Sequence, residues 1–204
     1  YRSFGIMSIV ELIFFLMTKA KHIPKLLQIF RDNGYDGATL SKISKEIGLG
    51  KASLYHHFPG GKDEMVEAVL DYLESETEKH ILQPLRSNED VKARFEKMCD
   101  GIGNMFDGGK QPCVFAVLLM GSSRNLFHEK VEMLLRSWIN AIASILIAEG
   151  LDKDLAVERG ENAVLMIEGA LILSQGLNNV TPFERVIGQL PEQLCQNLSS
   201  KSKF

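Results

Sequence analysis

Apolar residues recur along most of the chain three or four positions apart, the spacing that places them on one face of an α-helix. Between residues 39 and 62 this spacing predicts two short helices, over 40–47 and 51–57, joined by the turn Gly48-Leu49-Gly50. Thr39 suits the N-cap of the first helix, because its hydroxyl can accept a hydrogen bond from an amide of the first turn. Two helices joined by so short a turn predict a helix-turn-helix, whose second helix fits the major groove of DNA.

Helices are also predicted on both sides of this motif. The first covers residues 21–33 and ends at Asn33-Gly34. A long helix follows over 62–82, before Pro84. Gly60-Gly61 lies between the motif and this helix. We therefore expect the motif to tilt at these glycines on a rigid connection to the rest of the chain.

The second half of the chain is predicted to be helical throughout. The expected helices cover 87–106, 113–121, 126–149, 153–177 and 182–198. Thr181-Pro182 is typical of a helix start, with Thr181 as the cap, and Gly188 and Pro191 are expected to kink or end the last helix. No stretch alternates for long enough to predict a strand. The sequence thus predicts an all-α fold of about nine helices.

The predicted helix over 153–177 is apolar on more than one face. One face can pack on the core, but the other needs a second cover, and another copy of the chain is the most economical one. We expect the helices over 153–177 and 182–198 to pair with their two-fold mates. The sequence therefore predicts a homodimer with a four-helix interface.

Charge is divided unevenly along the chain, although the net charge of the 204 residues is only −3. Residues 17–62 carry +5, whereas residues 63–204 carry −8. A basic N-terminal part suits a polyanion such as double-stranded DNA, and the acidic remainder would be repelled by it. The alternative is that these charges are scattered over solvated surfaces with no partner.

Residues 43–70, ISKEIGLGKASLYHHFPGGKDEMVEAVL, resemble the DNA-binding domain of the TetR/AcrR family of bacterial transcriptional regulators. The double glycine before Lys62 is similar to the LmrA/YxaF-like branch. Further along, the segments LLRSWINAI, AEGLD, EGALIL and PFERVIGQL resemble the C-terminal domain of that branch, although Pro112-Cys113 reverses its Cys-Pro order. The resemblance implies a homodimeric repressor that binds a near-palindromic operator and is released by a small apolar or aromatic effector.

This resemblance divides the chain into three parts. Residues 17–63 are the expected helix-turn-helix DNA-binding domain, and residues 64–204 are the expected ligand-binding and dimerisation domain. Residues 1–16 do not fit the family, whose members usually begin near the position of Met17. An upstream extension from a mis-assigned start is the favoured explanation of residues 1–16, and an extra helix packed on the body is the alternative.

Seven residues of the motif are candidates for contact with DNA: Thr39, Ser41, Lys51, Ser53, Tyr55, His56 and Lys62. Tyr55, His56 and Lys62 are best placed for phosphates, whereas Lys51 and Ser53 are better placed for base edges. We expect His57 to be structural, because it lies near the apolar side of its helix. The alternative for the whole group is a solvated helix face, with Thr39 acting only as a cap.

Seven residues of the second half are candidates for an effector site. Six could line an apolar cavity between helices: Phe106, Cys113, Phe115, Met120, Trp138 and Met166. Glu168 lies within an apolar helix, where an ionised carboxylate is costly unless it has a partner. It could orient a polar group of the ligand or pair with a neighbouring helix. For the other six, ordinary packing in the core is the competing interpretation.

Other classes of protein find little support in the sequence. No Ser-His-Asp pattern, phosphate-binding loop, nucleotide fingerprint or metal-ligand cluster appears, so we expect neither catalysis nor a metal or cofactor. The three cysteines lack a Cys-x-x-Cys pair, which favours a reducing cytoplasm over a disulfide or zinc framework. The apolar run over 6–17 is too short to span a bilayer, so no membrane association is expected.

Overall fold

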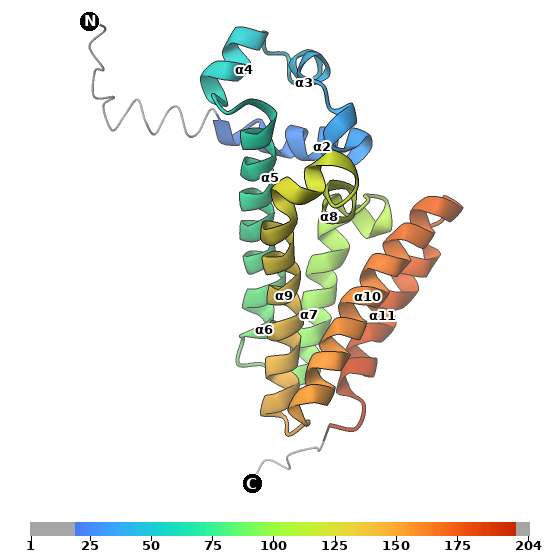
Figure 1. The fold of residues 1–204 in the computed structure, drawn as a ribbon. Coiled ribbons are helices and arrows are strands. Elements are labelled where there is room, and N and C mark those ends of the chain that lie inside the picture. The colour runs from blue at the N-terminus through green and yellow to red at the C-terminus, as the bar shows by residue number, and fades with distance from the viewer. Residues whose placement is uncertain (1–18, 199–204) are drawn as a thin grey trace, which may run out of the picture.

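A computed structural model of the chain describes residues 19–198, which excludes the stretch 1–16 discussed above. Three helices form a small unit at one end of the molecule, the head: α2 (Ile23–Gly37), α3 (Leu40–Ile47) and α4 (Lys51–His57) (Figure 1). Leu26, Phe30, Ile43, Leu54 and Phe58 are all buried between them. Their spacing along the sequence therefore gives the head its own apolar centre, as predicted.

The first helix of the head runs further than the sequence indicates. Gly34 does not end α2, which continues to Gly37 across a kink where Gly34 takes a φ of +63°. A residue with a β-carbon rarely adopts that backbone conformation, so glycine is what allows the helix to bend without stopping. The last turn of α2 is thereby directed toward the rest of the molecule.

A long helical column leaves the head and runs down the molecule. It consists of α5 (Gly61–Thr77), a π-helical turn η1 (Glu78–Leu82) and α6 (Gln83–Leu85). Pro84 does not interrupt it, and the column continues from the π turn η1 through Pro84 to Leu85. The π turn packs closely on the next helix: a β-carbon at Gly101 would lie 2.1 Å from the carbonyl oxygen of His80.

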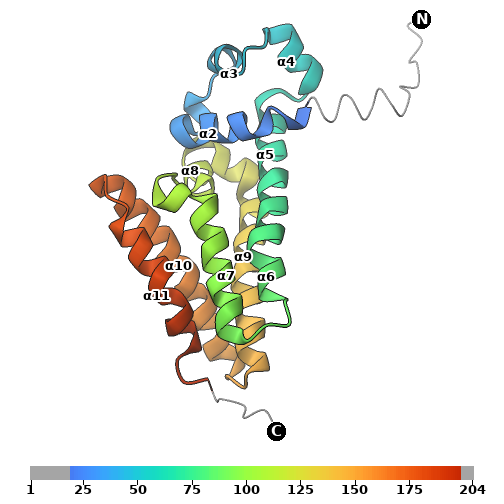
Figure 2. The same ribbon diagram turned by 180° about the vertical axis from the view of Figure 1, so that it is seen from behind.

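The remaining helices make up the body. They are α7 (Val91–Met105), α8 (Val114–Leu118), α9 (Arg124–Ala148), α10 (Lys153–Leu177) and α11 (Thr181–Cys195), with short 3₁₀ turns η2 (Asp107–Gly109) and η3 (Gly121–Ser123). α10 and α11 lie along one side of the bundle, and the α5–α6 column lies on the opposite side (Figure 2). Trp138, Phe95 and Phe183 are among the largest side chains buried between them. With α5, η1 and α6 counted as one helix, residues 19–198 form nine helices and no strand, as predicted.

Two details of α11 differ from the sequence prediction. Thr181 is the first helical residue rather than the cap, and its hydroxyl and its amide both bond to the side-chain oxygen of Asn179. The helix also continues through Gly188 and Pro191 to Cys195. Pro191 is buried within this helix, so tertiary packing outweighs its intrinsic tendency to stop a helix there.

The stretch Gly121–Ala148, which contains α9, has the length and apolar composition of a membrane span. Its apolar residues are nevertheless distributed as in a core helix. Val131, Leu134, Trp138 and Ile142 are buried against the other helices, at the three- to four-residue spacing of one face. The opposite face carries exposed polar residues such as Asn140, together with the exposed apolar residues Met133 and Ile147. α9 is therefore the core helix of a helical bundle.

Candidate nucleic-acid interface and ligand pocket

Local hydrogen bonds fix the angle between α3 and α4. The Thr39 hydroxyl accepts a bond from the Lys42 amide at 3.2 Å, which confirms Thr39 as the N-cap of α3. Gly48 ends α3 in the left-handed conformation, at a φ of +79°. The amides of Gly48 and Leu49 both donate to the Ser44 carbonyl oxygen, and the Ser44 hydroxyl donates back to Leu49. The turn is thus held by both its backbone and a side chain.

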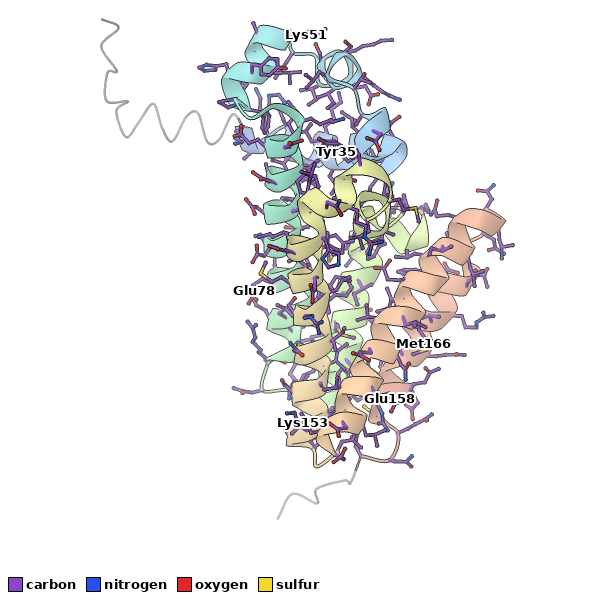
Figure 3. All side chains as sticks on the ribbon, viewed as in Figure 1. Tyr35, Lys51, Glu78, Lys153, Glu158 and Met166 are labelled. Carbon is purple, nitrogen blue, oxygen red and sulfur yellow. The ribbon has the colours of Figure 1, made fainter. Side chains whose placement is uncertain are left out.

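The outer face of α4 carries the chemistry that the sequence predicts. Lys51, Tyr55 and His56 are exposed, and Ser53 is half-buried. Lys51 stands at the end of the head that points away from the body (Figure 3). Thr39 and Ser41, at the start of α3, are exposed as well. A short helix with an ammonium, a phenol, a hydroxyl and an imidazole directed outward can meet phosphates and base edges together.

His57 has a different environment from its neighbour His56. It is buried, and its ring lies 5.9 Å from that of His22, the residue that precedes α2. Burial, followed by the nearby positive groups, lowers the pKa of His57, so the neutral imidazole is favoured. The structural role predicted for His57 agrees with this position.

Lys62 does not lie as the sequence suggested. Its ammonium donates a hydrogen bond to the Tyr35 carbonyl oxygen at 2.8 Å and stands 3.9 Å from the centre of the Tyr35 ring. Tyr35 is found where the head meets the body (Figure 3). The ammonium is thus turned inward, since a carbonyl oxygen and an aromatic face satisfy it there. Lys62 therefore links α2 to the start of α5, a contact that competes with the phosphate contact predicted for it.

Other cations of the head escaped the sequence-based selection. Lys21 and Lys25 are exposed near the start of α2, and Lys45 is exposed on α3. The basic charge of residues 17–62 was the only signal for them, because a charge count does not say which lysines are free. Lys42, by contrast, is hydrogen-bonded to Asn33.

A pocket of about 270 Å³ opens between α8 and α10. Its lining consists of Pro112, Cys113, Ala116, Val117, Met120, Glu168, Leu171, Ile172 and Gln175. Three of the seven predicted effector residues, Cys113, Met120 and Glu168, are therefore brought together. Most of the remaining wall is aliphatic, which suits a small apolar molecule.

The four other predicted effector residues do not line this pocket. Phe106, Phe115 and Trp138 are buried in the core, and Met166 is partly buried against it. Met166 follows the side of α10 that packs inward, whereas Glu168 faces the pocket, because two positions along a helix turn the side chain by about 200°. Sequence periodicity marks all of these residues as buried, and it cannot distinguish a cavity wall from packed core.

Cys113 and Glu168 form the polar centre of the pocket. Burial raises the pKa of the Glu168 carboxyl, and a hydrogen bond with Cys113 opposes that rise. Burial raises the pKa of the Cys113 thiol well above its usual range, so the group is a neutral thiol. One carboxylate oxygen of Glu168, Oε1, is buried and has no hydrogen-bond partner among the described residues.

α8 lies directly beneath the head, between the pocket and α2 (Figure 1). Val117 lines the pocket, and its Cγ1 lies 3.5 Å from the position that a β-carbon would take at Gly34, the kink of α2. A few residues on, the backbone amide and the hydroxyl of Ser122 both bond to the Asp36 carboxylate of α2. The same short segment therefore borders the pocket and supports the end of α2.

Arg31 strengthens this junction from the head side. Its guanidinium donates to the Met105 carbonyl oxygen at 3.4 Å and lies 6.0 Å from the centre of the Phe106 ring. Burial lowers the pKa of Arg31. A cation is thus held between α2 and the end of α7, so the junction contains polar and charged contacts as well as apolar ones.

A helix-turn-helix head carried on a helical body with an apolar pocket is the architecture of a DNA-binding transcriptional regulator. Comparison with known families agrees: residues 26–69 match the model of the bacterial regulatory proteins of the tetR family. Residues 90–189 match the C-terminal domain of LmrA/YxaF-like transcriptional regulators. The chain belongs to the TetR family of transcriptional regulators, in its LmrA/YxaF-like branch.

Individual relatives support both halves of this assignment. The chain is 28% identical to the regulator YxaF of Bacillus subtilis, over 85% of this chain and 93% of YxaF. It is 41% identical to the Staphylococcus aureus negative regulator IcaR, over 27% of this chain and 31% of IcaR. A TetR regulator from Chloroflexus aurantiacus has the same fold, with a TM-score of 0.71 and 21% identity over 89% of this chain and 96% of its own.

Proposed function

We propose that this DNA-binding regulator is a cytoplasmic homodimeric repressor whose hold on a near-palindromic operator is relieved by a small apolar effector. It acts without a cofactor and without catalysis. The observation that carries the ligand-responsive part is the position of α8, which borders the pocket on one side and α2 of the head on the other. The name of IcaR, a negative regulator similar to this chain in the head region, supports repression as the mode of control.

The proposed reading surface is the outer side of α3 and α4. Lys51 and Ser53 are assigned to base edges in the major groove, because they stand on the first turn of α4. Tyr55 and His56, further along, are assigned to phosphates, together with Thr39 and Ser41 at the start of α3. This assignment keeps six of the seven residues selected from the sequence.

The proposed dimer interface is the outer face of α10 together with α11. Three of the large apolar side chains that α10 exposes in the single chain lie along this face: Leu165 at 69%, Leu173 at 53% and Leu177 at 63%. Gly169 and Gly176 lie between them along the same face and allow a second helix to approach. Pairing two copies there buries this apolar face and presents two α4 helices to successive turns of DNA.

The proposed effector acts through α8. A molecule seated between α8 and α10 contacts Val117, and α8 packs against α2 beside its kink at Gly34. The ligand releases DNA only if it binds better to the arrangement in which the two heads no longer match the operator. This route differs from the one expected from the sequence, in which the effector displaced the body end of the helix after Lys62.

The test begins with selection of bound sequences from a random duplex pool, which supplies the operator. Small apolar compounds are then screened for release of that operator, and each active compound is titrated with and without operator DNA. Linkage requires that operator weaken ligand binding by the same factor by which ligand weakens operator binding. Val117→Ala should reduce this factor while leaving operator affinity in the absence of ligand unchanged. A selection that enriches no sequence overturns the proposal.

A further inference from the structure

We propose that the pocket between α8 and α10 selects apolar molecules that carry a cationic nitrogen, with the Glu168 carboxylate as the partner of that cation. This inference rests on the proposed function, since it names the chemical class of the effector. It rests on the few polar groups of the pocket, which together favour a ligand with a positive charge.

The first observation concerns the hydrogen-bonding atoms of the pocket that have no partner in the protein. Glu168 has one carboxylate oxygen that is buried and unbonded among the described residues. The Gln175 amide group donates to the Gly109 and Lys110 carbonyl oxygens at 3.0 and 2.9 Å, so its own carbonyl oxygen is the group left over. Both groups are acceptors. A ligand that complements them must bring donors.

The second observation is the absence of positive charge from the pocket wall. No lysine, arginine or histidine is among its lining residues in the described part of the chain. Arg31, the cation whose field reaches Cys113, is bonded to Met105 and lies over Phe106 outside the pocket. An anionic ligand such as a fatty acid would meet Glu168 with no cation to offset the repulsion.

A cationic nitrogen suits this site better than a neutral hydroxyl. An ionised carboxylate surrounded by aliphatic side chains is costly without a counter-charge, and the Cys113 thiol supplies only a weak donor. A protonated amine donates a hydrogen bond and also neutralises the charge, whereas a hydroxyl donates a hydrogen bond but leaves the buried charge without a counter-charge. The aliphatic walls, among them Ala116 and Ile172, then cover the alkyl part of the ligand.

The test uses three probes of equal chain length with the full-length protein: octylamine, octanol and octanoate. Calorimetric titration should show octylamine binding about ten-fold tighter than octanol, because only the amine brings a counter-charge to the buried carboxylate, and octanoate should bind weakest. Glu168→Gln keeps the shape of the side chain and should remove most of this preference for octylamine over octanol. Glu158→Gln is the matched control, because Glu158 is an exposed glutamate lower on the same helix (Figure 3).

Three results overturn the inference: octanol binding as tightly as octylamine, a preference that persists in Glu168→Gln, or no binding of any probe. Operator release, measured in parallel, separates this inference from the proposed function. If octanol alone binds and releases the operator, ligand-relieved repression is supported, but the proposal of a cationic effector is overturned. If octylamine binds through Glu168 while the operator stays bound, the class stands and ligand-relieved repression falls.

Discussion

Asp36 of the head and Ser122 of the body are joined twice: the carboxylate accepts one hydrogen bond from the Ser122 amide, at 3.3 Å, and another from its hydroxyl. The two residues are 86 positions apart in the chain. These bonds tie the last turn of α2 to the segment that follows α8. The packing is tight as well, because a β-carbon at Gly121 would lie 2.6 Å from the same carboxylate.

This pair predicts a pH-dependent contribution to stability. The hydrogen bonds from Ser122 lower the pKa of Asp36 in the folded protein. A carboxyl whose pKa is lower when folded stabilises the protein above its unfolded pKa, and the contribution fades as pH falls through the folded value, below about pH 4. Asp36→Ala should therefore destabilise the protein at pH 7 and by less at pH 3, as measured by urea unfolding.

Ser122→Ala supplies the control for that experiment. It removes one donor and leaves the carboxyl in place, so it should reduce the same pH dependence in part. The double variant should cost less than the sum of the single ones, because both changes break the same contact. Equal losses at pH 7 and pH 3 for Asp36→Ala would show that the carboxylate does not act through its charge.

Lys51→Ala tests base reading by α4. If Lys51 makes a bidentate contact with a base, its loss should weaken the selected operator by about 1–3 kcal/mol and relax the preference at one or two positions. Binding to random duplexes should fall far less. Lys153→Ala is the control, since this exposed lysine lies at the opposite end of the molecule (Figure 3). An equal loss of affinity for operator and for random DNA would indicate that Lys51 contacts a phosphate and not a base.

Lys62→Met tests the position of Lys62 at the junction. Methionine keeps the length of the side chain but loses the hydrogen bond to Tyr35 and the attraction to its ring. The free energy of unfolding should fall by about 1–2 kcal/mol. The slope of log affinity against log salt should stay unchanged, because no phosphate contact is lost. A slope reduced by about 0.9 would instead restore Lys62 to the DNA interface.

Leu173→Glu tests the dimer face. Leu173 is exposed in the single chain, so a carboxylate there should leave the fold intact and repel its mate across the two-fold axis. Sedimentation should show a folded monomer that no longer binds operator. Leu171→Glu, two positions earlier, should unfold the protein because Leu171 is buried. A Leu173→Glu protein that remains dimeric at micromolar concentration would place the interface elsewhere.

The sequence predicts the helices well because each one buries a regularly spaced apolar face. The pattern Leu40, Ile43, Ile47 is enough to place α3, and Thr39 and Gly48 mark its ends by their capping chemistry. Boundaries fail where packing overrides a local preference. Pro191 stays inside α11, and α2 passes through Gly34, since neither residue reveals from its neighbours which tertiary contacts it will make.

The candidate sites, like the helix boundaries, could be predicted from the sequence where local pattern decides and not where tertiary contacts decide. The outward residues of α4 follow from the motif, because a seven-residue helix with Leu54 buried leaves little choice of which side faces out. The contact of Lys62 with Tyr35 could not be predicted, because the two residues are 27 positions apart in the chain. Only three of the nine residues that line the pocket were predicted, since hydrophobicity marks Trp138 and Ala116 alike as inside. Glu168 was the exception, because a carboxylate among aliphatic residues demands a partner wherever it lies.

The two helices that line the pocket, α8 and α10, have different roles in the proposed mechanism. This difference affects how such a regulator could acquire new inducers. In that mechanism, Glu168 and Gln175 on α10 define the ligand chemistry, whereas α8, which carries Val117, packs against α2 of the head. Substitutions at position 168 or 175 can therefore change the compound that is sensed while the mechanical link to DNA remains as it was. Inducer choice and response can evolve independently, one helix at a time.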